Sequence, residues 1–232
     1  MSTALLYAFV FPDGNISLSP FQSSVPSILT LNSLIYGIRL GAFIFFREQS
    51  VASKKKAFQD LNNTEPLKRI PLALGVSLLY AFMTSPALFA LRGKALAAGS
   101  LSEKIQLGGT AVSVFGMILE AVADQHKYIA KIGKDGDDKF VGPTTWSYLL
   151  CRHPNYLGEI LFWIGMYAAG SVSFGKSVVA WSSGTLGLWG ILSIMFGASA
   201  RLDQKQEEKY GSQGAYADWK KKVCYSLVPL LK

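Results

Sequence analysis

Five apolar stretches of membrane-spanning length dominate this chain and limit the folds open to it. A helix needs about 20 apolar residues to cross the hydrocarbon core of a bilayer. Stretches of that kind lie at about 27–46, 70–91, 105–123, 155–174 and 177–198. Only 16% of the 232 residues are charged, which is well below the roughly 25% of soluble domains. The sequence therefore predicts an all-α fold, a polytopic membrane bundle of about five transmembrane helices.

Local features refine these five helices. Pro86 lies inside the second stretch, where a proline is expected to kink the helix. The third stretch contains Gly108, Gly109 and Gly116, small residues of the kind that let membrane helices approach closely. Only a short connection separates the fourth and fifth stretches, which predicts an antiparallel hairpin.

The basic residues indicate how the bundle is oriented. If the N-terminus lies outside, the inside segments 47–69, 124–154 and 199–232 hold 18 Lys and Arg, and the outside segments hold four. Such an excess marks the cytoplasmic side of membrane proteins. The C-terminus is thus predicted to be cytoplasmic. The net charge of +8 arises from these loops and forms no continuous stripe, so nucleic acid is not an expected partner.

The organisation along the chain is simple. Residues 1–26 are predicted to form an N-terminal stub, a short helix or a loop, and residues 27–232 a single membrane-embedded domain. Two cysteines, Cys151 and Cys224, give neither a disulfide framework nor a metal-binding spacing. We interpret both as unpaired structural thiols on the cytoplasmic side.

Polar side chains gather where the third stretch ends. Glu120, Asp124, Lys127 and Lys131 fall on one helical face, so they can form a polar stripe that leads out of the membrane. A row of ion pairs along the end of a solvated helix is the plain alternative for the two lysines. That alternative suits Glu120 less well, because a carboxylate within an apolar run needs a partner.

A second polar cluster opens the fourth stretch, in "LLCRHPNYLGEILFWIGMY". Pro154 suits the first turn of a helix, and the unpaired N–H groups there can bind an anion. Arg152 and His153 strengthen that site for a phosphate or carboxylate, while Asn155 and Glu159 lie on the same side, deeper in the membrane. An Arg152–Glu159 ion pair that closes the helix start is the structural alternative.

The C-terminal tail supplies a third cluster, which is predicted to emerge on the same side of the membrane. Arg201, Lys205 and Glu208 share a helical face, and Tyr210 and Tyr216 follow. A solvated amphipathic helix is the simpler interpretation of such a segment when it is considered alone.

Several familiar sites are missing from the sequence. We find no Gly-x-Gly-x-x-Gly after a strand, no phosphate-binding Gly-x-x-x-x-Gly-Lys-Ser/Thr loop and no nucleophile motif. The two histidines are 27 positions apart, so no metal site is predicted. Any cofactor must bind among membrane helices.

Three motifs resemble a known family. The segments "ADQHKY", "RHPNYLGE" and "EEKYG…Y…WKKKV…LVP" occur in the order and at the spacing of steroid 5-alpha-reductase-like membrane proteins, especially their branch of unknown function. The early segment "YGIRLGAFIFFRE" is also similar to that branch. The resemblance covers about residues 34–232. It implies a helical membrane reductase that uses NADPH, with the cofactor bound by residues 105–232.

The resemblance also implies individual roles. Matching positions suggest that the cofactor contacts Asp124 and Lys127, then the motif residues, and finally the tail. The full set of candidate cofactor-binding residues, including Glu120 and Lys131 from the polar stripe, is Glu120, Asp124, Lys127, Lys131, Arg152, His153, Asn155, Tyr156, Glu159, Arg201, Glu208 and Tyr210.

The implied reaction is the reduction of a C=C bond in a sterol, steroid or enone. A hydride passes from the nicotinamide to one carbon, and a protein acid protonates or polarises the other end. Tyr148, Tyr156 and Glu159 are the candidates for that catalytic acid. A lipophilic substrate would enter from the bilayer, and such proteins are expected in the endoplasmic reticulum or another internal membrane.

Two other functions stay open. Isoprenylcysteine and phospholipid methyltransferases share the Arg-His-Pro core and use S-adenosylmethionine, although "ADQHKY" and Glu159 favour the reductase. Full-length members of the reductase family usually have one or two more spans before the region that begins near residue 27. A truncated, non-catalytic membrane subunit is therefore the third possibility.

Overall fold

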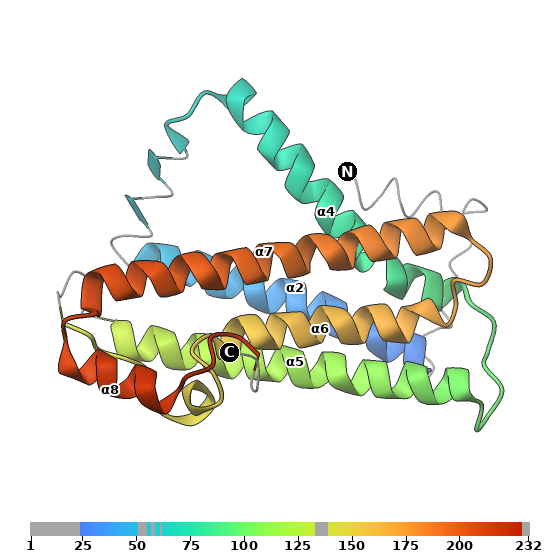
Figure 1. Cartoon of the computed structure of the whole chain (residues 1–232). Helices are drawn as coiled ribbons and strands as arrows, with labels where there is room; N and C mark the ends of the chain where they lie inside the picture. Colours follow the sequence, from blue (N-terminus) through green and yellow to red (C-terminus); the bar gives the residue numbers. More distant parts are fainter. Residues whose placement is uncertain (1–23, 51–54, 57–58, 61, 133–138, 229–232) are drawn as a thin grey trace. The chain divides into compact units, whose positions relative to one another are not determined.

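The chain folds into helices throughout the part that the structure describes. The structure is a computed structural model that describes residues 24–50, 55–56, 59–60, 62–132 and 139–228. Within those residues it contains no strand, which confirms the predicted all-α class (Figure 1). The main elements are α2 (Val25–Ser50), α4 (Pro66–Arg92), α5 (Leu101–Lys131), the 3-10 helix η2 (Trp146–Leu149), α6 (Pro154–Ser171), α7 (Val178–Tyr210) and α8 (Gly214–Lys222).

Helices α2, α4, α5 and α7 are long and apolar enough to cross a membrane. The chain is therefore a multi-pass membrane protein. Helix α6 forms where the fourth span was predicted and begins at Pro154, but it has only 18 residues and carries Asn155 and Glu159 in its first turns. Helix α7 continues 12 residues past the predicted end at 198, so the first part of the predicted tail is helical.

Contacts within the chain divide it into two compact units, which we describe separately. The first unit comprises Met1–Gly37, Pro66–Gly116 and Ile160–Leu192, and the second comprises Ile38–Glu65, Met117–Glu159 and Ser193–Lys232. The N-terminal stub predicted over 1–26 lies almost wholly outside the described residues. The single membrane domain over 27–232 stays a prediction.

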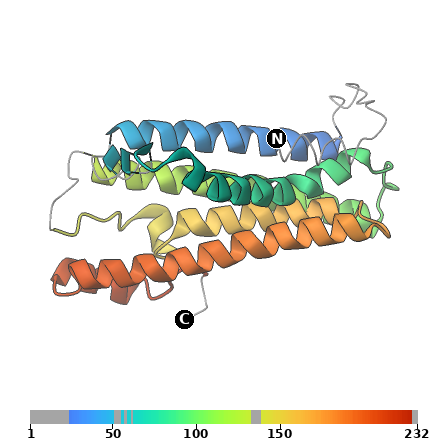
Figure 2. The same ribbon diagram turned by 90° about the horizontal axis from the view of Figure 1, so that it is seen from above.

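Small residues bring helices close together in the first unit. A Cβ atom added to Gly165 of α6 would lie 2.4 Å from the backbone nitrogen of Ser113 and 2.5 Å from the carbonyl oxygen of Gly109, both in α5. Figure 1 shows α6 running alongside α5, and Figure 2 gives the view from above, in which α4 covers much of α5. The predicted role of Gly109 is thus confirmed. The prediction for Gly108 is wrong, because a Cβ there would meet nothing within 4 Å.

Helix α4 continues through Pro86 and remains hydrogen-bonded there. Proline has no N–H, so the carbonyl of Phe82, four residues earlier, loses its usual partner. The hydroxyl of Ser85 donates to that carbonyl at 2.8 Å. Ser183 of α7 in turn donates to the Ser85 hydroxyl at 3.1 Å. A buried pair of serines therefore joins α4 to α7 beside the proline.

The predicted hairpin between the fourth and fifth stretches is confirmed within the first unit. Six residues separate α6 from α7. The Tyr167 hydroxyl lies 3.0 Å from the Thr185 hydroxyl across the hairpin. The rings of Phe174 and Trp181 pack edge to face, with centroids 5.1 Å apart.

Aromatic side chains form the core of the second unit near its C-terminal end. The Phe140 ring packs against Tyr210, Tyr216 and Trp219, with centroid distances of 5.6, 5.2 and 5.3 Å. The Phe140 N–H also donates to the side chain of Gln213 at 2.7 Å. These contacts hold α8, the end of α7 and the segment at 140 together, beside the η2 helix.

Candidate functional site

Asp203 of α7 is half-buried and is the centre of a hydrogen-bond cluster with the buried side chains of Arg152 and His153 in the second unit. Its carboxylate accepts from Arg152 Nε at 3.1 Å and from Arg152 Nη2 at 2.8 Å. His153 Nε2 lies 2.8 Å from the same carboxylate, and the Ser226 hydroxyl also donates to it. Two residues predicted to bind an anion are therefore bound to a carboxylate of the protein itself.

The same cluster fastens the C-terminal segment. Arg152 Nη1 donates to the carbonyls of Val223 and Cys224 at 3.1 and 2.9 Å. The backbone N–H groups of Arg152 and His153 donate to the carbonyls of Tyr225 and Ser226. These bonds tie the residues just before α6 to residues 223–226. Asp203, rather than Glu159, is the carboxylate that pairs with Arg152 in a two-point contact.

Burial sets the protonation of this cluster. It lowers the pKa of His153 below its usual value, although the hydrogen bond to Asp203 opposes that shift. A neutral His153 can donate its Nε2 proton to Asp203. Burial also raises the pKa of the neighbouring Cys151 thiol to about 11. A thiol with so high a pKa is unreactive, which agrees with the structural role predicted for it.

A second buried network joins α2, α5 and α6. Arg39 Nη2 donates to Glu120 Oε1 at 2.6 Å, and Arg39 Nη1 donates to Asp124 Oδ2 at 3.2 Å. The other oxygen of Asp124 accepts from Asn155 Nδ2 at 3.2 Å. A buried carboxylate needs such partners, and one guanidinium here serves two. The motifs "ADQHKY" and "RHPNYLGE" thus meet through Asp124 and Asn155.

Two oxygen atoms in this network have no hydrogen-bond donor among the described residues. They are Asn155 Oδ1 and Glu120 Oε2. Asn155 is 8% exposed and Glu120 only 2%. Because Asn155 turns its amide NH₂ toward Asp124, its carbonyl oxygen faces away from that carboxylate. Buried acceptors without donors are costly, so a group with an N–H or O–H fits this position.

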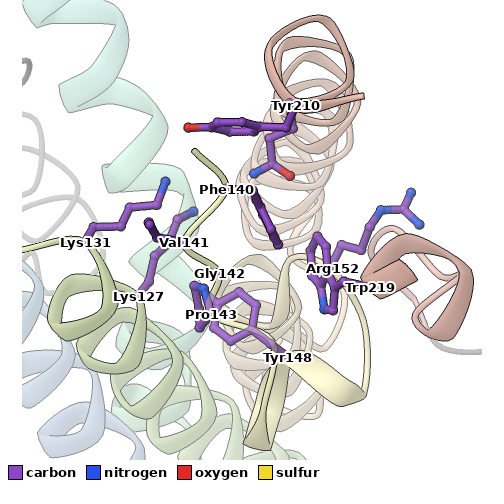
Figure 3. Close-up of a pocket in the computed structure, with 11 residues that line it drawn as sticks. Lys127, Lys131, Phe140, Val141, Gly142, Pro143, Tyr148, Arg152, Tyr210 and Trp219 are labelled. Carbon is purple, nitrogen blue, oxygen red and sulfur yellow. The ribbon is translucent and has the colours of Figure 1, made fainter. Parts of the chain in front are cut away.

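A small cleft lies beside the Asp203 cluster. Figure 3 shows Lys127 and Lys131 on one side of Phe140, and Arg152 and Trp219 on the other. The cleft encloses about 20 Å³, which is roughly the space of one water molecule. The indole N–H of Trp219 has no acceptor among the described residues, and that side chain is buried. The lining of the cleft thus combines basic side chains with a neutral N–H donor. Its complete lining is Lys127, Lys131, Phe140, Val141, Gly142, Pro143, Tyr148, Arg152, Gln206, Tyr210 and Trp219.

Of the three candidate acids, Tyr148 is buried and the other two are half-buried. Tyr148 is buried and donates its hydroxyl to the Ala123 carbonyl at 3.3 Å, and burial raises its pKa. The Tyr156 ring stacks on His153 with centroids 5.7 Å apart. Glu159 is half-buried on α6 and interacts electrostatically with Glu120.

The tail residues are brought only partly into the site. Tyr210 lines the cleft and packs against Phe140. Arg201 and Glu208 are exposed on α7, where Glu208 accepts from Gln204 one turn away at 2.9 Å. That contact within one helix matches the amphipathic alternative for Glu208.

Arg39 and Asp203 are two charged residues of the site that the sequence-based set lacked. Arg39 could have been found, because a cation within an apolar span is expected to pair with an acid. Asp203 is one charge among several in a polar helix end, and its position in the sequence carries no comparable indication.

Comparison with known proteins identifies the family. Residues 8–223, nearly the whole chain, match DUF1295, described as a protein of unknown function. The chain belongs to the DUF1295 family. No curated protein and no solved structure matches it significantly.

Proposed function

We propose that this DUF1295 protein is a membrane oxidoreductase that reduces a C=C bond of a lipid-like substrate with NADPH. The observation that carries the proposal is the bond between Asn155 and Asp124, which unites the two motifs that resemble steroid 5-alpha-reductase-like proteins. It leaves the carbonyl oxygen of Asn155 as a buried acceptor for a neutral donor, such as a carboxamide.

The chemistry of the surrounding side chains fits a dinucleotide. Lys127 and Lys131 supply positive charge for phosphates, Trp219 supplies a neutral donor, and Tyr210 and Phe140 supply ring faces. The resemblance implies that Arg152 and His153 contact the cofactor, but we assign them a different role. Their hydrogen bonds to Asp203 and to residues 223–226 make them structural supports of the site. The cleft holds about 20 Å³, so binding of a dinucleotide requires the cleft to open.

The bound cofactor would supply a hydride to one carbon of the double bond. A proton must reach the other carbon, so that hydride and proton together complete the reduction. Tyr156 and Glu159 lie on the first two turns of α6, close to Asn155 in sequence, and are the residues we assign to that proton. The Tyr148 hydroxyl already donates a hydrogen bond to the Ala123 carbonyl, which makes Tyr148 the weaker candidate. Apolar surroundings keep water from competing for the hydride.

Calorimetry on the detergent-solubilised full chain tests the cofactor directly. We expect NADPH to bind, and S-adenosylmethionine not to bind. Binding of S-adenosylmethionine without either NADPH or NADH would instead establish a methyltransferase-like site. Absence of binding by all three would favour a non-catalytic subunit.

Two variants test the assigned residues. Asn155→Ala should weaken NADPH binding about tenfold, because a buried hydrogen bond is worth about 1 kcal/mol or more. Glu159→Gln should lower the rate of NADPH oxidation with an enone. Asn63→Ala, which changes an exposed asparagine near the start of α4, is the matched control. Unchanged affinity and rate in both site variants would contradict the assignment.

The orientation is proposed on the distribution of charge. An excess of Lys and Arg in alternate loops supports a cytoplasmic C-terminus. The family resemblance implies an internal membrane such as the endoplasmic reticulum. Protease treatment of sealed vesicles should remove a C-terminal tag without detergent. Protection of that tag would show that the C-terminus lies on the opposite side of the membrane.

A further inference from the structure

A larger groove lies elsewhere in the second unit, between the C-terminal half of α2 and α5. It encloses about 510 Å³, and none of its lining residues belongs to the "RHPNYLGE" motif. The aromatic residues Phe43, Phe46 and Tyr128 form its walls. The remaining lining residues are Arg39, Arg47, Ser50, Ala121 and Gln125.

Arg47 is the cation of this groove that the described residues leave without an ion pair. Its guanidinium lies 5.3 Å from the centroid of the Phe43 ring, and its Nε is buried without a hydrogen-bond acceptor among those residues. Arg39 differs, because Glu120 and Asp124 already bind its guanidinium. The charge available to a ligand is therefore that of Arg47.

Two further donors lie in the same groove. The Gln125 amide and the Tyr128 hydroxyl make no hydrogen bond to any side chain or backbone group that the structure describes. The Tyr128 ring packs edge to face with Phe43, centroids 6.3 Å apart, so Tyr128 and Arg47 both contact the same ring. A guanidinium, an amide and a hydroxyl together suit the oxygens of a phosphate.

The walls of the groove distinguish a lipid from a free phosphate. Phe46, which lines the groove, is 65% exposed on α2, and the neighbouring Phe45 outside the groove is 58% exposed. Helix α2 is long and apolar enough to cross a membrane. A hydrocarbon chain can lie along such side chains, whereas a free phosphate gains nothing from them. The sequence after α2 continues with Lys54, Lys55 and Lys56, as is usual at the cytoplasmic surface. Basic pockets between membrane helices on that side suit anionic head groups.

We propose that this groove binds an anionic phospholipid, with its phosphate on Arg47, Gln125 and Tyr128 and its acyl chains along α2. The proposal is independent of the reductase function. It assigns Arg47 to lipid recognition, whichever cofactor the protein uses.

Native mass spectrometry of the full chain tests the groove. The protein in detergent is mixed with palmitoyl-oleoyl phosphatidylglycerol or with the zwitterionic phosphatidylcholine of the same chains. We expect preferential retention of phosphatidylglycerol. Arg47→Ala should reduce that retention about tenfold, as expected for loss of a charge-assisted hydrogen bond. Tyr128→Phe keeps the ring and should reduce retention less.

The control is Lys104→Ala, which removes one positive charge from an exposed site near the start of α5. It should retain the lipid as the wild type does, and circular dichroism should show equal helix content in all variants. Equal retention of the two lipids, or equal loss in Arg47→Ala and Lys104→Ala, would overturn the proposal. Displacement of phosphatidylglycerol by millimolar inorganic phosphate or by NADPH would also overturn it, in favour of a soluble phosphate ligand.

Discussion

Helix α5 contributes to both units, and its two halves meet their neighbours in different ways. In the first unit, Gly109 and Ser113 lie so close to Gly165 that no side chain separates the backbones. In the second unit, Glu120 and Asp124 project carboxylates that bind Arg39 and Asn155. One helix thus packs by small residues in its first half and by paired charges in its second.

This difference has a physical meaning in a membrane protein. Helices in lipid gain little from burying apolar side chains against each other, so close packing of small residues holds them together. Burying a charge in the same surroundings costs free energy, so buried charges are expected where they have a functional role. The first unit should therefore be sensitive to added volume, and the second to the loss of a charge.

Removing the carboxylate of Asp203 should have the largest effect on stability. Asp203→Ala leaves Arg152 and His153 buried without their acceptor, and breaking a buried ion pair of this kind costs about 3 kcal/mol. We expect a clear fall in the thermal unfolding midpoint in detergent. Asp218→Ala, an exposed position on α8, is the control. Equal shifts in the two variants would show that the Asp203 cluster does not stabilise the second unit.

Adding one methyl group to the first unit should have the next largest effect. In Gly165→Ala the new Cβ meets backbone atoms of α5 at about 2.5 Å, and overpacking of this kind costs about 2 kcal/mol. Gly108→Ala places the same group in open space, where alanine favours the helix by up to about 1 kcal/mol. A stable Gly165→Ala protein would contradict the contrast between the two units.

Acidification should weaken the second unit through His153. Burial holds the pKa of His153 in the folded protein below the ordinary value of 6.5, despite the opposing effect of Asp203. At a pH between the pKa of His153 in the folded protein and its pKa in the unfolded chain, His153 is protonated in the unfolded chain and neutral in the folded protein. The contribution of His153 to the free energy of unfolding is therefore fully present above pH 6.5. It is lost as the pH falls toward and through the pKa of His153 in the folded protein.

The measurement is the unfolding midpoint between pH 7.5 and 5.5. Lys127 and Arg152 also act on His153 and lower its pKa, so the dependence should persist in high salt only in part. His153→Gln keeps a donor for Asp203 but cannot titrate, and its midpoint should change less over that range. An identical pH dependence in the variant would assign the effect to another group.

The sequence predicts the helices better than it predicts their polar contacts. Apolar runs determine where helices form, and Pro154 marks the first residue of α6 correctly. The proximity of Asp124 and Asn155 also follows from placing both at one side of a membrane. The partner of Arg152 does not follow, because the sequence indicates only Glu159 as its carboxylate and nothing in it brings Asp203 of α7 close. Only the three-dimensional arrangement shows that Asp203 accepts from both Arg152 and His153.

The smallest effect is expected from an ion pair that resembles Arg152–Asp203 in distance alone. Lys220 Nζ lies 2.6 Å from Glu207 Oε2, yet the two side chains are 42% and 51% exposed. Water and salt screen such a pair, and its ordering costs side-chain entropy. Lys220→Ala should therefore leave the unfolding midpoint unchanged, at low and at high ionic strength. A fall comparable to that of Asp203→Ala would mean that charge pairing, rather than burial of the paired charges, stabilises the second unit.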